Sequence, residues 1–282
     1  MLETESSVYY DLVHDVITHT DKERLVTFGM NLGYNSCTLG AQRIRNSSEA
    51  EHINIPWSVI LHLDADHYLV HQEQYKQAIT QGEEMGIYTW QFITASQPEL
   101  FLPLVSEHPD SAFILFCNPD EITAEFLDDA AELNNLMLTV HYREESAELF
   151  ETMRDMGFLY SVYYIYSPDD VESILNGDLF YSIQQANPVF TALTADSTCS
   201  RQTQIQVYDS IKKLRDSQCL QTVPWEMLQD CSFINEIISS KAYSVVFGAD
   251  GTLYMNCPEC SYTGYNLFDS DLKIIFQQLN IK

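Results

Sequence analysis

Residues 58–75 read SVILHLDADHYLVHQEQY, and this stretch sets the pattern for most of the chain. Its first part, residues 58–61, is a short apolar run of the kind that forms a buried strand. Acids and imidazoles follow, and the spacing of Tyr75, Ala78 and Ile79 then predicts a helix with one apolar face. A strand that leads through polar residues into a helix is the repeating unit of parallel β/α folds.

The same alternation recurs downstream. Further strands, each followed by a helical stretch, are expected at 87–93, 111–117, 136–142, 158–166 and within 187–195. The junctions Asn118-Pro119-Asp120-Glu121 and Ser167-Pro168-Asp169-Asp170 each combine an N-cap residue, Pro at the first helical position and acids in the first turn. Six such units predict an α/β fold, a partial (β/α)6 TIM-like barrel.

The pattern changes after about residue 220. Residues 241–256, KAYSVVFGADGTLYMN, predict a β-hairpin around an Asp-Gly turn, and DSDLKIIFQQL near the end predicts a short amphipathic helix. We therefore expect three parts. Residues 1–55 form an N-terminal helical segment of unclear role, 56–219 the partial barrel, and 220–282 a small C-terminal hairpin and helix extension.

Composition narrows the choice of partners. The chain has 282 residues, 45% of them hydrophobic, and a formal net charge of −27. Such a chain repels phosphate backbones and anionic lipid, so nucleic acid and membrane surfaces are poor partners. Solubility is the default explanation of the charge, and attraction of a basic peptide or subunit is the alternative. No apolar run reaches the length of a membrane span, and the start lacks the pattern of a secretion signal, which favours a cytoplasmic location.

Two readings fit the polar cluster after the first strand. His62, Asp64, Asp66, His67 and His71 offer oxygen and nitrogen ligands to a divalent metal, as in a metal-dependent hydrolase built on a β/α barrel. Alternatively, the two aspartates cap the helix that follows or remain solvated in a remodelled loop. The other strand ends supply few further ligands, which favours the second reading.

The seven cysteines include one pair at metal-ligand spacing. Cys257 and Cys260, in CPEC, follow the predicted hairpin, as the paired ligands of zinc ribbons and iron–sulfur sites do. A second pair is missing, so Cys231, Cys219 or Cys199 would have to complete the set. A single iron–sulfur cluster or a zinc ion at Cys231, Cys257 and Cys260 is one hypothesis, and free thiols are the other.

Two further arrangements carry weaker hypotheses. Cys117 ends an apolar strand and could pair with His141 in a Cys–His hydrolase, but nothing in the sequence activates the thiol, which reads better as a core residue. A peptide groove or ordinary alternating burial would each explain four tyrosines on one strand: Tyr160, Tyr163, Tyr164 and Tyr166.

The order of these elements over about residues 57–279 resembles the radical SAM enzymes that carry a SPASM-type C-terminal extension. In that family the loop after the first strand carries CxxxCxxC, which holds a [4Fe–4S] cluster that binds S-adenosylmethionine. The corresponding loop here, LDADHYLVHQ, is short and has no cysteine. Carboxylates and imidazoles are poor substitutes for three thiolates.

The family's Gly-Gly-Glu-Pro motif, which holds the methionyl end of the cofactor, aligns with Ala95-Ser96-Gln97-Pro98. Only the proline is kept, and side chains replace bare backbone. Asp64, Asp66, His67 and Gln97 thus mark a degenerate site, and we expect no S-adenosylmethionine.

The C-terminal part resembles SPASM regions in VVFGADGTLYMNCPEC and YTGYNLFDSDLKIIF, although such regions use more cysteines than are found here. The resemblance implies a non-catalytic accessory protein in the maturation of ribosomally made peptides. Its partner would be a precursor peptide or an authentic radical SAM enzyme, held at the open side of the partial barrel.

Overall fold

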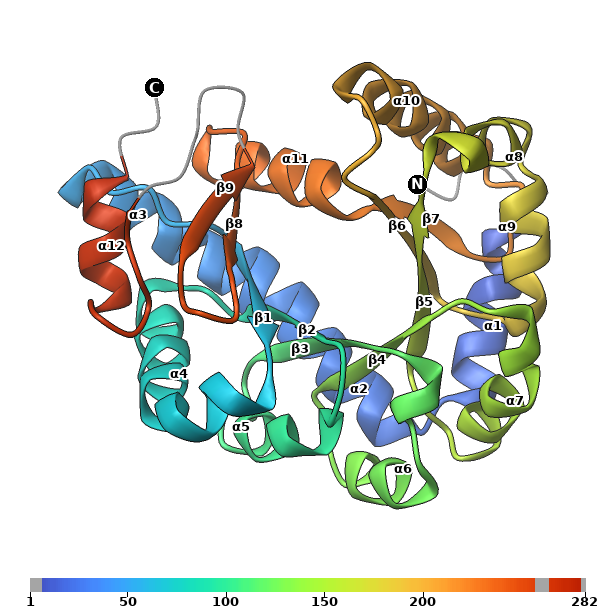
Figure 1. Ribbon diagram of the computed structural model, residues 1–282, viewed down its shortest axis with the longest axis horizontal. Helices are drawn as coiled ribbons and strands as arrows, with labels where there is room; N and C mark the ends of the chain where they lie inside the picture. The colour runs from blue at the N-terminus through green and yellow to red at the C-terminus, as the bar shows by residue number, and fades with distance from the viewer. Residues whose placement is uncertain (1–6, 257–263, 280–282) are drawn as a thin grey trace. The chain divides into compact units, whose positions relative to one another are not determined.

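The computed structural model describes residues 7–256 and 264–279 (Figure 1). Its contacts divide the chain into two compact units. The smaller unit comprises residues 1–25 and 138–230, and the larger unit comprises residues 26–137 and 231–282. The boundaries fall inside helix α2 (Lys22–Met30), strand β4 (Leu136–His141) and helix α11 (Met227–Ser239).

The larger unit contains five strands in the order β3-β2-β1-β8-β9. Strands β1 (Ser58–Leu63), β2 (Thr89–Thr94) and β3 (Ala112–Cys117) are parallel, and β8 (Ser244–Phe247) pairs parallel with the other edge of β1. Strand β9 (Leu253–Asn256) pairs antiparallel with β8, which confirms the predicted hairpin. Because β8 hydrogen-bonds to β1, this hairpin extends the sheet of the larger unit.

Helices cross between these strands, as parallel pairing requires. The connections are α4 (Ala65–Met85) after β1, η2 (Pro98–Phe101) with α5 (Leu102–Ser106) after β2, and η3 (Pro119–Glu121) with α6 (Ala124–Ala131) after β3. The π-helix η1 (Asn31–Gly40), α3 (Ala41–Glu51) and α12 (Leu272–Gln278) complete the larger unit.

Helix α4 shows how the sequence sets this packing. It ends at Gly86, whose positive φ of 105° suits glycine. One turn earlier, a Cβ on Gly82 would lie 2.4 Å from the Trp90 ring, so the absence of a side chain lets the helix rest on β2. On this face of the sheet four apolar side chains are fully buried: Trp90, Phe92, Phe113 and Leu115.

The smaller unit contains parallel strands in the order β7-β6-β5-β4. Its elements are α1 (Tyr9–His19), β4, η4 (Glu144–Ser146), α7 (Ala147–Asp155), β5 (Tyr160–Tyr166), η5 (Pro168–Asp170), α8 (Val171–Asn176), α9 (Asp178–Ile183), η6 (Gln184–Ala186), β6 (Phe190–Ala195), α10 (Arg201–Ser217) and β7 (Val223–Glu226). Strand β7 ends the order and contains Pro224, a residue that edge strands tolerate.

The fold class is the predicted one: α/β, with parallel strands and helical crossovers of the partial TIM-like barrel type. The structure adds a seventh strand–helix unit, β7 with α11, that the sequence patterns missed. The contact units cut the chain at different places from the predicted boundaries at 55/56 and 219/220, and those boundaries stay a prediction.

The two Pro-containing junctions fold differently. Ser167 forms the expected capping box with Asp170. Asn118 makes no side-chain cap, and the helix α6 is capped instead by Thr123, whose hydroxyl accepts from the Phe126 amide at 3.1 Å. The prediction for Asn118 was therefore wrong, because the amide side chain is used elsewhere, as described below.

Candidate functional site

The junction between β1 and α4 consists of one residue, Asp64. Its backbone is extended, and its Oδ1 accepts a hydrogen bond of 2.8 Å from the amide of His67, which is the geometry of a helix N-cap. The His67 ring lies against the same carboxylate, with Nδ1 2.9 Å from Oδ2. Asp66 lies exposed in the first turn. Asp64 therefore caps helix α4, as the second interpretation predicts for the aspartates, and Asp66 makes no such contact.

The other two imidazoles of this stretch, His62 and His71, do not join the pair of Asp64 and His67. His71 stacks on Phe268 with ring centroids 3.9 Å apart and planes 7° from parallel. His62 is exposed near the end of β1. Within residues 7–256 and 264–279, no three His, Cys, Asp or Glu side chains are grouped so that they could hold a metal ion. The described residues therefore provide no set of metal ligands that would support the hydrolase interpretation.

The loop after β2 is tied by hydrogen bonds from the next junction. The carbonyl oxygen of Ala95 accepts from Asn118 Nδ2 at 3.1 Å, and the amide of Gln97 donates to Glu121 Oε2 at 3.1 Å. Gln97 itself has a positive φ of 52°, a conformation that favours glycine. The backbone groups that a ligand would use here are therefore occupied by the protein's own side chains.

A [4Fe–4S] cluster with S-adenosylmethionine does not fit these residues. The chain has no cysteine between Cys37 and Cys117, and a one-residue junction leaves no loop on which three thiolates could be placed. Cys117, at the end of β3, is fully buried, and burial raises the pKa of its thiol to about 12. It is a core thiol, as one interpretation of the sequence held.

Of the three cysteines of the metal hypothesis, the structure describes Cys231. Cys231 is buried on α11, where its sulfur accepts from Gln91 Nε2 at 3.2 Å and its carbonyl accepts from Trp57 Nε1 at 3.0 Å. Cys257 and Cys260 lie outside the residues that the structure describes. A zinc ion or a single iron–sulfur cluster at these cysteines remains a prediction.

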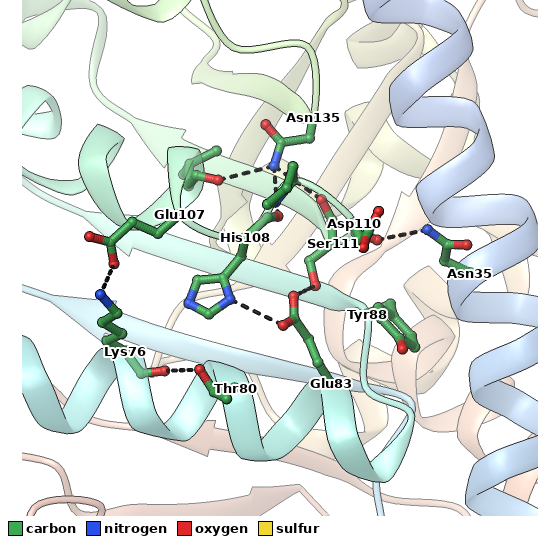
Figure 2. A network of polar contacts seen from close by, with 12 residues as sticks. Asn35, Lys76, Thr80, Glu83, Tyr88, Glu107, His108, Asp110, Ser111 and Asn135 are labelled. Atoms are coloured by element: carbon green, nitrogen blue, oxygen red, sulfur yellow. Dashed lines mark hydrogen bonds and ion pairs between the residues drawn. The ribbon is translucent and has the colours of Figure 1, made fainter.

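Ser111, Glu83 and His108 form a polar group near the amino end of β3 (Figure 2). Glu83 accepts from the hydroxyl of Ser111 at 2.7 Å, and its second oxygen lies 3.1 Å from Nδ1 of His108. Asn135 Nδ2 donates to the carbonyls of His108 and Ser111. Because serine and histidine both contact the glutamate rather than each other, this group lacks the nucleophile–base hydrogen bond of a triad. It ties α4 to the start of β3.

In the smaller unit the two faces of the sheet differ. One face packs against helices α8, α9 and α10 in a fully buried cluster that includes Tyr166, Ile174, Phe180, Leu193, Val207 and Ile211. Side chains alternate along a strand, so Tyr160, Tyr164 and Tyr166 share this face, and Tyr163 points to the other one. A groove lined by all four tyrosines is therefore excluded.

The opposite face carries a row of side chains that crosses all four strands. His141 pairs with Tyr163, Tyr163 with Ala192, and Ala192 with Trp225. The His141 and Tyr163 ring centroids are 4.9 Å apart. All three rings are half-buried, and Ile165, two residues beyond Tyr163 on the same face, is 46% exposed. Parallel sheets normally bury both faces, so a partly exposed face is a candidate binding surface. We call it the aromatic row.

A buried acid group holds the strand that bears Trp225. Asp230 Oδ1 accepts from Arg215 Nη2 at 2.8 Å and from the Tyr208 hydroxyl at 3.2 Å, while Oδ2 accepts from the amide of Glu226 at 2.8 Å. Glu226 is 2% exposed, and burial raises the pKa of its carboxyl to about 7. These contacts fix the end of β7 to the start of α11 and to α10.

Sequence reasoning had singled out His141 and Tyr163 but not Trp225. The missing signal was strand β7, whose four residues VPWE include a proline and follow no clear alternation. The row also depends on the register of strands that lie up to 84 residues apart in the chain, between His141 and Trp225.

Comparison with known proteins gives a structural likeness and no family assignment. No family model matches the sequence, and no curated protein matches it. Streptococcus suis SuiB bound to S-adenosylmethionine matches with a TM-score of 0.60 at 8% identity, covering 86% of this chain and 69% of that one. SuiB bound to the precursor peptide SuiA matches with a TM-score of 0.56 at 10% identity, with the same coverage of both chains. The chain therefore shares the fold of SuiB over most of its length.

Proposed function

We propose that this protein is a non-catalytic relative of radical SAM enzymes that binds a precursor peptide in a peptide-modification pathway. The observation that carries the proposal is the one-residue junction at Asp64, where the resembled family has a cluster-binding loop.

Three features of the larger unit support the absence of radical chemistry. Asp64 is used as the cap of α4, the loop at residues 95–98 is held by Asn118 and Glu121, and the thiol of Cys117 is buried. Each contact uses a group, or fills a place, that the cluster or its cofactor would need. A scaffold that has lost these sites keeps its strands and its open surface.

The aromatic row supports the binding half of the proposal. Half-buried aromatic side chains on a flat strand surface supply contact area with little loss of side-chain entropy. The solved structure of SuiB with SuiA shows that a protein of this fold accommodates a precursor peptide. We infer that the peptide of this protein lies on the aromatic row.

A basic partner suits the net charge of −27, whether it is the peptide itself or an authentic radical SAM enzyme that acts on it. Among the described residues no helix is long and apolar enough to cross a membrane. The cytoplasmic location remains an expectation.

The test is a selection of random 12-residue peptides displayed on phage against the purified protein. We expect the selected peptides to bind wild type and to lose about 30-fold in affinity on Tyr163→Ala or Trp225→Ala, the loss of a typical aromatic hot spot. Tyr181→Ala, which removes an exposed aromatic side chain from α9, is the matched control and should leave affinity unchanged.

Circular dichroism would confirm that each variant is folded. A selection that yields no binder, or binders that tolerate both substitutions in the aromatic row, would contradict the proposed binding function.

A further inference from the structure

Strand β7 has few main-chain bonds to hold it in the sheet. It is four residues long, lies at the end of the strand order and pairs with β6. Its Pro224 has no N–H to donate to the ladder. A short edge strand of this kind opens locally at a lower free-energy cost than the strands inside a sheet. Its position therefore depends on the side-chain contacts at its end.

Those contacts involve two buried carboxyl groups and one guanidinium. Glu226 and Asp230 are each 2% exposed. Asp230 is paired with Arg215, whose Nη1 also donates to the carbonyl oxygen of Pro224 at 3.4 Å. Glu226 accepts instead from the amide of Gln229, at 2.7 Å from its Oε2. One guanidinium against two carboxyl groups leaves a surplus buried negative charge whenever both acids are ionised.

The other titratable groups near Glu226 supply no further positive charge. Tyr208 on α10 donates its hydroxyl to the second carboxylate at 3.2 Å. On β5 the buried hydroxyl of Tyr166 has no hydrogen-bond partner within the described residues, and burial, with a smaller effect of Glu226, raises its pKa. Cys199, whose sulfur donates to the Tyr166 carbonyl at 3.4 Å, also has its pKa raised by burial. These neighbours are neutral at pH 7.

A carboxyl group in this setting keeps its proton to a higher pH than a solvated one. Burial raises the pKa of Glu226 to about 7; the hydrogen bond from the Gln229 amide opposes the rise and the charge of Asp230 adds to it. Once the proton is lost, contact with water stabilises the carboxylate. The end of β7 is the part of the sheet that has to move to give it that contact.

We propose that Glu226 is a proton-dependent switch: its protonated carboxyl group holds β7 in the sheet, and loss of the proton opens β7 and the start of α11 locally. Trp225 precedes Glu226 in the same strand, so the switch also controls whether the indole stays in the aromatic row. The inference goes beyond the proposed function, because it concerns the scaffold and holds whatever ligand lies on the row.

The test is amide hydrogen exchange of the full chain at pH 6 and pH 8, resolved residue by residue by NMR. Each rate is divided by the intrinsic rate at that pH, so that the remaining change reports opening of the structure. A carboxyl pKa of 4.5 in the open strand and of about 7 in the closed one predicts that the opening constant rises about tenfold between the two pH values. We expect this rise at the amides of Trp225 and Gln229, and no rise at Val162 on β5 or Leu193 on β6.

Two variants separate the switch from other effects of pH. Glu226→Gln removes the titration and should make the protection of the β7 amides equal at the two pH values. Glu172→Gln, the same change at an exposed position of α8, is the matched control and should keep the tenfold rise. If Glu226→Gln does not fold, the comparison of β7 with β5 and β6 in the wild-type protein still decides.

An equal rise at every amide would show that Glu226 acts only on global stability, and this result would overturn the switch. Unchanged protection of the β7 amides, or a tenfold rise that persists in Glu226→Gln, would overturn it as well. None of these measurements involves a ligand. Failure of the switch therefore leaves the peptide-binding function standing, and a failed peptide selection leaves the switch standing.

Discussion

The larger and the smaller unit are built from the same strand–helix repeat, but they differ in what they leave accessible. In the larger unit, side chains from one strand–helix junction hydrogen-bond to the backbone of the neighbouring junction, as Asn118 and Glu121 do at residues 95–98. In the smaller unit one sheet face is covered by helices, and the other carries the half-buried rings of the aromatic row. The difference is what the proposed function requires: contacts within the protein at the junctions of the larger unit, and a partly exposed surface in the smaller unit.

The largest expected effect concerns the ion pair between Arg215 and Asp230, which holds the end of β7 in place. Arg215→Ala should lower the free energy of unfolding by about 3 kcal/mol, because it leaves the buried carboxylate of Asp230 without its charged partner. Lys212→Ala, which removes an exposed ion pair with Asp209 from the same helix, should cost less than about 0.5 kcal/mol. Urea denaturation measures both, and equal effects would show that the pair is not a support for β7.

The pH dependence of stability should come next in size. Burial raises the folded-state pKa of Glu226 to about 7, so the folded protein holds a proton that the unfolded chain has released. The contribution of this group to stability is therefore highest below pH 4.5, falls as pH rises towards 7, and is constant above it. The total change is roughly 3 kcal/mol, from 1.36 kcal/mol per pKa unit.

Glu226→Gln should remove this fall and make the protein more stable than wild type at pH 8. Denaturation curves at pH 5 and pH 8 provide the comparison. If wild type and variant differ by the same amount at the two pH values, Glu226 titrates normally.

A smaller effect is expected at the junction between β1 and α4, where the resembled family has its cluster-binding loop. Asp64→Ala should destabilise the protein by about 1 kcal/mol, the usual cost of losing an N-cap, and Asp66→Ala by less than about 0.5 kcal/mol. Thermal unfolding of the two variants tests the capping assignment. A larger loss at Asp66 would point to a role for that carboxylate beyond solvation.

The smallest effect should be a gain. Gln97 has a φ of 52°, so Gln97→Gly should stabilise the protein by up to about 1 kcal/mol because glycine adopts this backbone conformation without strain. S-Adenosylmethionine binding should not appear in this variant, because Glu121 still accepts from the amide at position 97. Isothermal titration with S-adenosylmethionine would show whether side-chain bulk alone had closed the loop.

Much of the strand–helix order could be predicted because it depends on local patterns. The apolar runs that form β1 to β6, the hairpin and the capping box at Ser167 all depend on short stretches of sequence. Strand β7 was missed because VPWE is short and contains a proline. The sequence predicts Asn118 to be an N-cap, but in the structure its side-chain amide donates to the carbonyl of Ala95.

The candidate site was harder to predict than the fold. The absence of cysteines after the first strand could be read from the sequence, but the one-residue junction and the hydrogen bond to the Gln97 amide depend on how neighbouring strand ends meet. The aromatic row combines residues from four strands, and only their register shows that Ala192 lies between Tyr163 and Trp225. Long-range register is not contained in local periodicity.

The central claim is that the radical-SAM-like fold of this protein operates without the cluster and its cofactor. The most direct measurement is anaerobic reconstitution of the full chain with iron and sulfide, followed by metal and sulfide analysis and equilibrium dialysis against labelled S-adenosylmethionine. We predict no binding of S-adenosylmethionine, with or without reconstitution, and no cluster that depends on residues 58–98. Stoichiometric binding of S-adenosylmethionine to a reconstituted [4Fe–4S] protein would contradict the account.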